Sequence, residues 1–498
     1  MNLHRQSAPS PSPNAVSHPQ SGSLAPDASI ACNVPALPRR AAVALIDGEH
    51  YPQVVADALR LLADRFSFKG VLFLGGTEKI KSSRLEDEAL GLYGIPVLFD
   101  SDPCAGLARA VAKFHPEVIV DLSDEPVLGY KERFRLISES LARNVSYIGS
   151  DFQFSPASAA RLCVSPSLSI IGTGKRVGKT AVSGYVARTL KRTMSGAFSG
   201  PPVVVVAMGR GGPAQPELVN WPQEELTVEK LLALSRQGRH AASDHFEDAL
   251  LSGVVTVGCR RCGGGMAGEP FVSNVVEGVL LANSLNPGFM VLEGSGAACP
   301  PVATDARLLV ASALQPVADV AGMLGTYRLL TSDAVLLTMA EAPTISKARL
   351  AALVRAIREV RPEAPVLPVI FRPFPLESVR GKKVAFFTTA PADHVPRLCR
   401  HLEGEFGCRV TFCSGNLARR SALRRDLGAR ELAEAEVVLT EIKAAAIDAV
   451  AEEAAKRELP VIPVDNVPVE APGERAGALE ELVQELRELA TQRFERGA

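Results

Sequence analysis

The stretch that decides the fold is Ser169-Ile170-Ile171-Gly172-Thr173-Gly174-Lys175-Arg176-Val177-Gly178-Lys179-Thr180. An apolar run at 168–171 predicts a buried strand, and residues 180–192 have the apolar spacing of a helix. A strand, a glycine-rich turn and a helix form the setting of a phosphate-binding loop. Glycine lets backbone N–H groups turn toward an anion, and the helix N-terminus adds positive potential.

This loop predicts a nucleotide site, with ATP as the ligand and Mg²⁺ as its metal ion. Lys179 is placed to reach the terminal phosphates, and the Thr180 hydroxyl is placed to bind Mg²⁺. Five residues, not the usual four, separate Gly172 from Gly178. The alternative is an ordinary glycine-rich turn, which the Gly-Lys-Thr ending disfavours. The predicted nucleotide-binding residues are Gly172, Thr173, Gly174, Val177, Gly178, Lys179 and Thr180.

Length and composition limit the classes of protein that fit. The 498 residues correspond to roughly three domains of about 100–200 residues each. A net charge of −1 and an aromatic content of 5% argue against nucleic acid or an anionic membrane as a partner. No apolar run suits a transmembrane helix and no signal peptide is evident, so we expect a cytoplasmic protein. The nine dispersed cysteines fit a reducing compartment; Cys259 and Cys262 have metal or redox spacing, but no second pair lies nearby.

The N-terminal part predicts a tail and a first domain. Ser, Pro, Ala, Asn and Gln dominate residues 1–38, so we expect a disordered tail there. Alternating strands and helices then predict a Rossmann-like parallel sheet over 39–159. Ligands bind at the carboxyl ends of the strands in such sheets. The first strand is followed by Asp47, Glu49 and His50, which are candidate substrate contacts; the alternative for each is a turn or helix-cap role.

The central domain, predicted over 160–380, carries the phosphate loop and further charged strand ends. Glu293 ends a buried strand, the usual place for an acidic group that holds Mg²⁺, so Thr180 and Glu293 are the metal candidates. Arginine beside glycine suits a multiply charged anion, so we interpret 259–268 as a substrate loop, with solvated surface arginines as the alternative. The basic candidates for the substrate are Lys175, Arg176, Arg210, Arg260 and Arg261.

The whole chain therefore predicts an α/β fold with three parts. A parallel-sheet N-terminal domain precedes the central phosphate-loop NTPase domain. The segment Phe371-Arg372-Pro373-Phe374-Pro375 marks the end of the central domain, and a smaller C-terminal α/β domain is predicted over 381–498. A charged helix from about residue 477 closes that last domain.

Two resemblances rest on these motifs. The variant phosphate loop and Glu293-Gly294-Ser295-Gly296 resemble dethiobiotin synthetase and its relatives. From about residue 40 onward, the chain resembles the cyclic 2,3-diphosphoglycerate synthetase family. The motifs that carry this wider resemblance are Ile46-Asp47-Gly48-Glu49-His50-Tyr51-Pro52, residues 172–180, Met208-Gly209-Arg210-Gly211-Gly212-Pro213, residues 293–296 and Phe371-Arg372-Pro373.

The wider resemblance implies ATP-driven closure of a phosphoanhydride ring between the two phosphates of 2,3-diphosphoglycerate, with release of ADP and phosphate. Such a reaction brings several negative charges together, so charge neutralisation and positioning dominate it. We assign the catalytic role to Lys179, Lys175, Arg176 and Arg210. We assign substrate binding to Asp47, Glu49, His50, Arg210, Arg260 and Arg261.

Other functions stay open at this stage. A small-molecule kinase acting on 2-phosphoglycerate would use the same site. A carbon–nitrogen ligase fits the arginine-rich stretches less well, and a nucleotide-dependent switch or scaffold protein is the non-enzymatic alternative. A phosphorylated small molecule is the expected partner, and a homodimer is left open.

Overall fold

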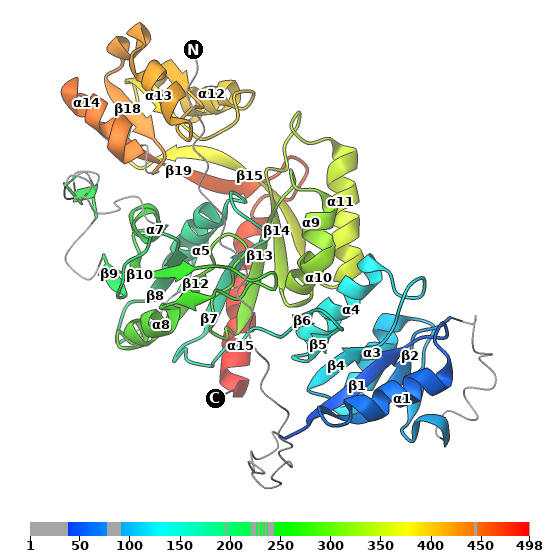
Figure 1. The fold of residues 1–498 in the computed structure, drawn as a ribbon. Helices are drawn as coiled ribbons and strands as arrows, with labels where there is room; N and C mark the ends of the chain where they lie inside the picture. The colour runs from blue at the N-terminus through cyan, green and yellow to red at the C-terminus, as the bar shows by residue number, and fades with distance from the viewer. Residues whose placement is uncertain are drawn as a thin grey trace, which may run out of the picture. The chain divides into compact units, whose positions relative to one another are not determined.

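The computed structural model describes residues 38–76, 91–194, 196, 198–220, 226–227, 230–231, 233–234, 237, 244–442 and 446–497. The tail predicted for 1–38 lies outside these residues, except for residue 38. From Arg40 onward the chain forms an α/β unit with a 6-stranded and a 13-stranded sheet (Figure 1). The α/β class predicted from the sequence is confirmed.

The N-terminal domain is built on the 6-stranded sheet, in the order β3-β2-β1-β4-β5-β6. All neighbouring strands are parallel except β5 and β6. The chain first adds β2 and β3 on one side of β1 and then returns to add β4 on the other, so β1 and β4 form the topological switch point. The elements are β1 (Arg40–Ile46), α1 (Pro52–Leu62), β2 (Phe66–Phe73), β3 (Val97–Phe99), α3 (Pro103–Phe114), β4 (Val118–Asp121), α4 (Tyr130–Ala142), β5 (Ser146–Ile148) and β6 (Gln153–Phe154).

The central domain places the phosphate loop in the middle of the larger sheet. Its first strand, β7, is fully buried between the parallel strands β12 and β13. The elements are β7 (Ser167–Gly172), α5 (Lys179–Thr193), β8 (Val203–Gly209), β9 (Glu217–Val219), α7 (Asp244–Ser252), β10 (Val255–Cys262), β11 (Val272–Ser273), α8 (Val275–Asn283), β12 (Phe289–Glu293), β13 (Ala306–Ser312), α9 (Val317–Ala321), α10 (Met323–Leu330), β14 (Ala334–Thr338), α11 (Lys347–Val360) and β15 (Val366–Pro375).

The C-terminal part continues the same sheet. Its elements are β16 (Lys383–Phe387), α12 (Val395–Phe406), β17 (Arg409–Ser414), α13 (Arg420–Leu427), the 3₁₀ helix η1 (Arg430–Glu434), β18 (Val437–Thr440), the π-helix η2 (Ala446–Ala451), α14 (Glu452–Lys456), β19 (Val461–Glu470) and α15 (Ala478–Gly497). The segment 371–375, predicted to mark the end of the central domain, forms the second half of β15. That strand is parallel to β14 and then pairs antiparallel with β19.

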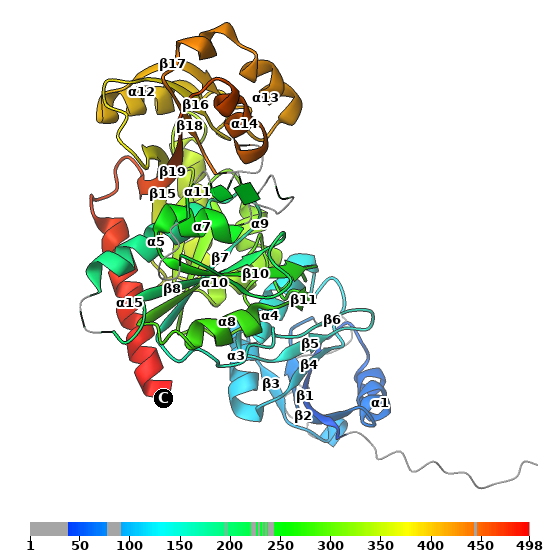
Figure 2. The same ribbon diagram turned by 90° about the vertical axis from the view of Figure 1, so that its left-hand side faces the viewer.

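The last helix, α15, was predicted to close the C-terminal domain, but it packs against the central domain. The apolar side chains of α15 join the buried cluster of β7, α5 and β13 in the central domain. The helix lies beside β7 and β13 (Figure 1), and Figure 2 shows it along one side of the central domain. This packing follows from an amphipathic stripe at helical spacing: Leu479, Leu482, Val483, Leu486 and Ala490.

Candidate active site

The phosphate loop connects β7 to α5 and depends on two glycines. Gly178 begins α5 with a φ of +88°, and a Cβ atom there would lie 2.3 Å from the ring of Phe371. A Cβ atom on Gly172 would lie 2.9 Å from Cδ of Lys179 and 3.0 Å from the carbonyl oxygen of Gly296. The Lys179 side chain therefore passes close over the end of β7, and larger residues at either glycine would push the loop away.

Two side chains from neighbouring strand ends hold the loop in shape. The Thr338 hydroxyl at the end of β14 donates to the carbonyl oxygen of Val177 at 2.8 Å. The Thr173 hydroxyl donates to Oε1 of Gln315 at 2.6 Å, and the Thr173 N–H donates to the carbonyl oxygen of Val310 at 3.1 Å. Gln315 and Thr338 were not predicted from the sequence. Thr338 could have been suspected as a polar residue at a buried strand end, whereas nothing in the sequence singles out Gln315.

The predicted metal residues lie together. Thr180 Oγ1 donates to Oε1 of Glu293 at 3.1 Å, because β12 is parallel to β7 and brings Glu293 opposite Ile170. Glu293 and Lys179 are both buried, with 3% and 8% of their surface exposed. A hydroxyl and a carboxylate beside a phosphate loop fit Mg²⁺, which takes one or two protein oxygens and completes its octahedron with water and phosphate oxygens.

Two of the predicted arginines meet beside the phosphate loop. The register pairs Gly209 of β8 with Arg260 of β10, so Arg210 and Arg261 follow as neighbours on one face of the sheet. A Cβ atom on Gly296 would lie 2.6 Å from Nη2 of Arg210 and 3.3 Å from Nη2 of Arg261. Since the Gly296 carbonyl in turn borders Gly172, this pair of guanidinium groups lies next to the phosphate loop.

The turn that carries Gly296 is held by arginine side chains. Nη2 of Arg261 donates to the carbonyl oxygen of Ser295 at 2.7 Å, and Nη2 of Arg328 donates to that of Ala297 at 2.9 Å. Gly296 itself has a φ of +60°, which favours glycine. Arg328, on α10, is 6% exposed and makes its hydrogen bonds to backbone carbonyls. It was not predicted, because its role depends on a turn that is distant in the sequence.

The remaining basic candidates are exposed. Residues 259–262 belong to strand β10, so the prediction that they form a loop is wrong. Strand alternation points the Arg260 side chain to the opposite face of the sheet from Arg261. The same alternation separates the buried Cys259 from the exposed Cys262. The metal or redox role considered for that pair is therefore geometrically disfavoured. Lys175 and Arg176 are exposed on the phosphate loop, and Arg176 has a φ of +63°.

In the N-terminal domain, the predicted residues Asp47, Glu49 and His50 follow β1 at the topological switch point. Asp47 is fully buried, and its Oδ1 accepts hydrogen bonds from the Glu49 N–H at 3.0 Å, from the His50 N–H at 3.2 Å and from His50 Nδ1 at 2.8 Å. Its Oδ2 accepts from the Asp124 N–H, after β4, at 2.6 Å. The Asp47 carboxylate therefore shapes the loop, whereas Glu49 and His50 are half-buried at its surface.

A second carboxylate at this switch point is also enclosed by donors. Oδ2 of Asp121, at the end of β4, accepts from Nε of Arg133 at 2.9 Å and from the Tyr147 hydroxyl at 2.8 Å. Burial, and then the nearby Asp121 carboxylate, raise the pKa of Tyr147 well above its ordinary value. Tyr147 consequently stays protonated and keeps donating, which fixes Asp121 as a structural group.

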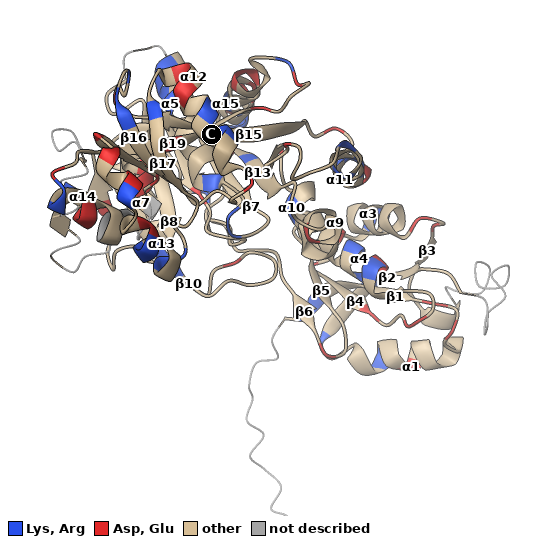
Figure 3. Cartoon of the chain, turned by 90° about the horizontal axis from the view of Figure 1, so that it is seen from above, with Lys and Arg blue, Asp and Glu red and all other residues tan. Residues whose placement is uncertain are grey.

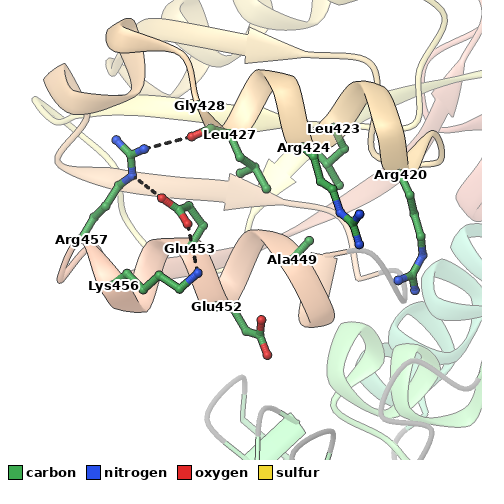
Figure 4. A pocket seen from close by; sticks show the side chains of 10 residues that line it. All are labelled: Arg420, Leu423, Arg424, Leu427, Gly428, Ala449, Glu452, Glu453, Lys456 and Arg457. Atoms are coloured by element: carbon green, nitrogen blue, oxygen red, sulfur yellow. Dashed lines mark hydrogen bonds and ion pairs between the residues drawn. The ribbon is translucent and has the colours of Figure 1, made fainter.

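A cavity of about 370 Å³ lies elsewhere, between α13 and α14 of the C-terminal part (Figure 4). Its charged lining has both signs, as the colouring of α14 shows (Figure 3). Glu453 accepts from Nε of Arg457 at 2.9 Å and lies 3.4 Å from Nζ of Lys456, and these two cations are therefore already paired. The cavity shares no residue with the phosphate-loop cluster.

Taken with the fold, the site defines a class of protein. A glycine loop at the centre of a parallel sheet, a buried lysine at the start of the next helix and an acid at the neighbouring strand end characterise the phosphate-loop NTPases. No helix among the described residues has the length and apolar character needed to cross a bilayer.

Comparison with known proteins identifies the family within that class. Three family models match, namely the N-terminal domain of cyclic 2,3-diphosphoglycerate synthetase at 41–155, its P-loop domain at 167–370 and its C-terminal domain at 375–467. The chain belongs to the cyclic 2,3-diphosphoglycerate synthetase family, as the sequence resemblance predicted.

Individual relatives agree with this assignment. The cyclic 2,3-diphosphoglycerate synthetase of Rubrobacter xylanophilus is 51% identical over 77% of this chain and 84% of its own length. That of Methanothermus fervidus is 43% identical over the same shares. Among solved structures, HypB from Helicobacter pylori in complex with nickel matches 41% of this chain and 78% of its own at 16% identity, with a TM-score of 0.24, which is too low to indicate a shared fold.

Proposed function

We propose that this chain is an ATP-dependent synthetase that joins the two phosphates of 2,3-diphosphoglycerate into a cyclic phosphoanhydride. The observation that carries the proposal is the meeting of Arg210 and Arg261 beside the phosphate loop. A substrate with two phosphates carries about four to five negative charges at neutral pH. A chain with a net charge of −1 does not attract it globally, so a concentrated basic site is required.

The nucleotide half of the site follows from the loop. Backbone N–H groups between Gly172 and Thr180 would bind the ATP phosphates, and Lys179 would neutralise charge on the transferred phosphoryl group. Thr180 and Glu293 would hold Mg²⁺. When bound, the ion would offset charge on the phosphate oxygens. In the first step a substrate phosphate oxygen would attack the γ-phosphorus of ATP, and ADP would leave.

The substrate half uses the arginine pair. In the second step an oxygen of the other substrate phosphate would attack the phosphorus of the activated one, closing the ring and expelling inorganic phosphate. Arg210 would bind phosphate oxygens in a fixed fork. Arg261, whose two Nη groups already donate to the carbonyl oxygens of Gly263 and Ser295, would add positive charge beside it. Phosphate oxygens are nucleophilic at neutral pH, so this step needs no dedicated base. Exposed Lys175 and Arg176 at the loop would add positive charge.

The N-terminal domain has a secondary place in this proposal. Glu49 and His50 are proposed to contact the substrate, with Asp47 holding their loop in shape. A homodimer and a cytoplasmic location remain predictions.

Product stoichiometry separates the synthetase from a kinase that acts on 2-phosphoglycerate. Given 2,3-diphosphoglycerate, the synthetase releases one inorganic phosphate for each ADP, whereas the kinase, given 2-phosphoglycerate, releases ADP without inorganic phosphate. A switch or scaffold protein would hydrolyse ATP at the same slow rate with and without the three-carbon acid. Equal ADP and phosphate release, stimulated by 2,3-diphosphoglycerate, is the expected result.

Neighbouring arginines offer a matched test of the substrate site. Arg210 has no ion pair with any described carboxylate, so Arg210→Ala removes charge with little structural loss. We expect its KM for 2,3-diphosphoglycerate to rise about tenfold or more, because a charge-assisted bond contributes about 1.5–3 kcal/mol, while the KM for ATP changes little. Arg260→Ala, on the opposite strand face, is the comparison variant. Equal weakening of ATP and substrate by Arg210→Ala would place this arginine in the nucleotide site instead.

A further inference from the structure

Two thiols lie together in the C-terminal part of the chain, far from the phosphate loop in the sequence. Cys399 is on α12 and Cys413 is on β17, which is the edge strand of the 13-stranded sheet. Neither forms a disulfide, and each thiol shifts the pKa of the other. Cys399 is buried in the core of this region, whereas Cys413 is exposed. The pair therefore combines one accessible thiol with one protected thiol.

A β-bulge aims Cys413 at the helix. Val384 of β16 pairs with Val410, but the next residue, Ala385, pairs with Phe412, so Thr411 is an extra residue in β17. Val410 packs against the cluster that contains Cys399, and Phe412 packs on the other face of the sheet. The Cys413 side chain therefore points to the α12 face, as the Val410 side chain does. In a regular strand, residues three positions apart point to opposite faces, so the bulge is what places both on this face.

The helix and strand are also in register. The start of α12 meets the end of β17, because a Cβ atom on Gly415 would lie 3.2 Å from Cγ2 of Val395. From there, Cys399 is four helical residues away, about 6 Å, and Cys413 is two extended residues away, about 6.6 Å. Helix α12 and strand β17 run in opposite directions, as in any β-α-β unit. Cys399 and Cys413 therefore lie at a similar distance from the contact between Val395 and Gly415.

The surroundings give the two thiols different reactivities. The neighbouring Cys399 thiol lowers the pKa of Cys413 below its ordinary value, and the same interaction together with burial raises the pKa of Cys399. A larger fraction of Cys413 than of an ordinary cysteine is then thiolate at neutral pH. The thiolate is the nucleophilic form, so Cys413 reacts first and Cys399 is placed to respond.

We propose that Cys413 and Cys399 form a peroxide-sensitive dithiol, which oxidises to a disulfide between β17 and α12. The Cys413 thiolate attacks a hydroperoxide, forming a sulfenic acid and releasing hydroxide, or an alkoxide from an organic peroxide. The Cys399 sulfur then attacks the Cys413 sulfur, forms the S–S bond and expels the hydroxyl group, which leaves as water with the Cys399 proton. The peroxide is the oxidant, and a dithiol reductant would restore both thiols.

Peptide mapping of the full-length protein tests this proposal directly. Trypsin would separate the three nearby cysteines into Leu398–Arg400, His401–Arg409 and Val410–Arg419. After dilute hydrogen peroxide and blocking of the remaining thiols, we expect Leu398–Arg400 linked to Val410–Arg419, with loss of two hydrogen atoms. A link through the fragment that holds Cys408, or no greater oxidation of Cys413 than of the exposed Cys262, would overturn the proposal.

Three variants assign the order of events. Cys399→Ser should stop the reaction at the Cys413 sulfenic acid, giving at least fivefold more dimedone adduct at Cys413 than the parent protein. Cys413→Ser, at an exposed site where folding is least affected, should leave Cys399 unoxidised. Cys262→Ser is the matched control and should form the disulfide at the parental rate. Oxidation of Cys399 that persists in Cys413→Ser would contradict the assigned roles.

Discussion

The phosphate loop and the 47–50 loop both follow a buried parallel strand, yet they use their charged groups differently. Around the phosphate loop, Arg210 and Arg261 converge on Gly296, and Arg210 has no ion pair within the described part of the chain. After β1, Asp47 is fully buried and accepts four hydrogen bonds from its own domain. Within the described residues, the Arg210 charge therefore stays available for a ligand, whereas the Asp47 carboxylate stabilises its own loop.

This difference shows what a strand-end position does and does not establish. It brings side chains to the edge of the sheet where ligands bind. It does not determine whether a charged group is a ligand contact or part of the scaffold. That distinction depends on how many hydrogen bonds the protein already makes to the group, because a carboxylate saturated by backbone N–H groups has little capacity left for a substrate.

The largest expected effect is that of Lys179→Ala. If the lysine neutralises charge on the transferred phosphoryl group, as we propose, its loss should reduce kcat by roughly 10²–10³-fold or more. ADP release measured with saturating ATP and 2,3-diphosphoglycerate checks this. The control is Lys191→Ala on the same helix, where the exposed lysine donates to the carbonyl oxygen of Gly253 and to no other described residue. Parental turnover in Lys179→Ala would remove the phosphate loop from the mechanism.

A smaller effect is expected for Glu293→Gln, which keeps the shape of the side chain and removes its charge. The amide oxygen can still accept from Thr180, so the fold should persist, but it binds Mg²⁺ more weakly than a carboxylate does. We expect the Mg²⁺ concentration for half-maximal activity to rise about tenfold. Glu277→Gln, an exposed change on α8, should leave the titration unchanged. Overlapping titrations for Glu293→Gln and the parent protein would make Glu293 a structural strand-end residue.

The sequence predicted the parts of the site that depend on local order. The strand, glycine turn and helix around Gly172–Thr180 are contiguous, and Glu293 directly ends an apolar run, so both could be located before the structure. The meeting of Arg210 with Arg261 could not. It depends on the register of β8 against β10. It also depends on β10 continuing to Cys262, although the glycine run that follows Cys262 favours a loop there.

Long-range pairing explains the other differences. Pro373 and Pro375 lack backbone N–H groups, which favours a boundary, yet both lie in β15 opposite β19. Residues almost a hundred positions apart decide that pairing, and no local pattern encodes it. The apolar stripe of α15 was equally visible in the sequence, but an amphipathic helix does not specify which surface it will cover.

The smallest effect on catalysis, and the sharpest test of the comparison, is expected for Asp47→Asn. An amide keeps one accepting oxygen and loses the other, so either the Asp124 N–H or the group around Glu49 and His50 loses its acceptor. A buried donor without a partner costs about 1–3 kcal/mol, so the amides in this loop should exchange hydrogen roughly ten- to 100-fold faster, as measured by mass spectrometry. The KM for ATP should stay the same.

Asp57→Asn, an exposed change on α1, is the control and should alter neither hydrogen exchange nor activity. If Asp47→Asn instead left exchange unchanged and weakened the diphosphorylated substrate, Asp47 would be a ligand contact, and the two strand-end loops would work in the same way.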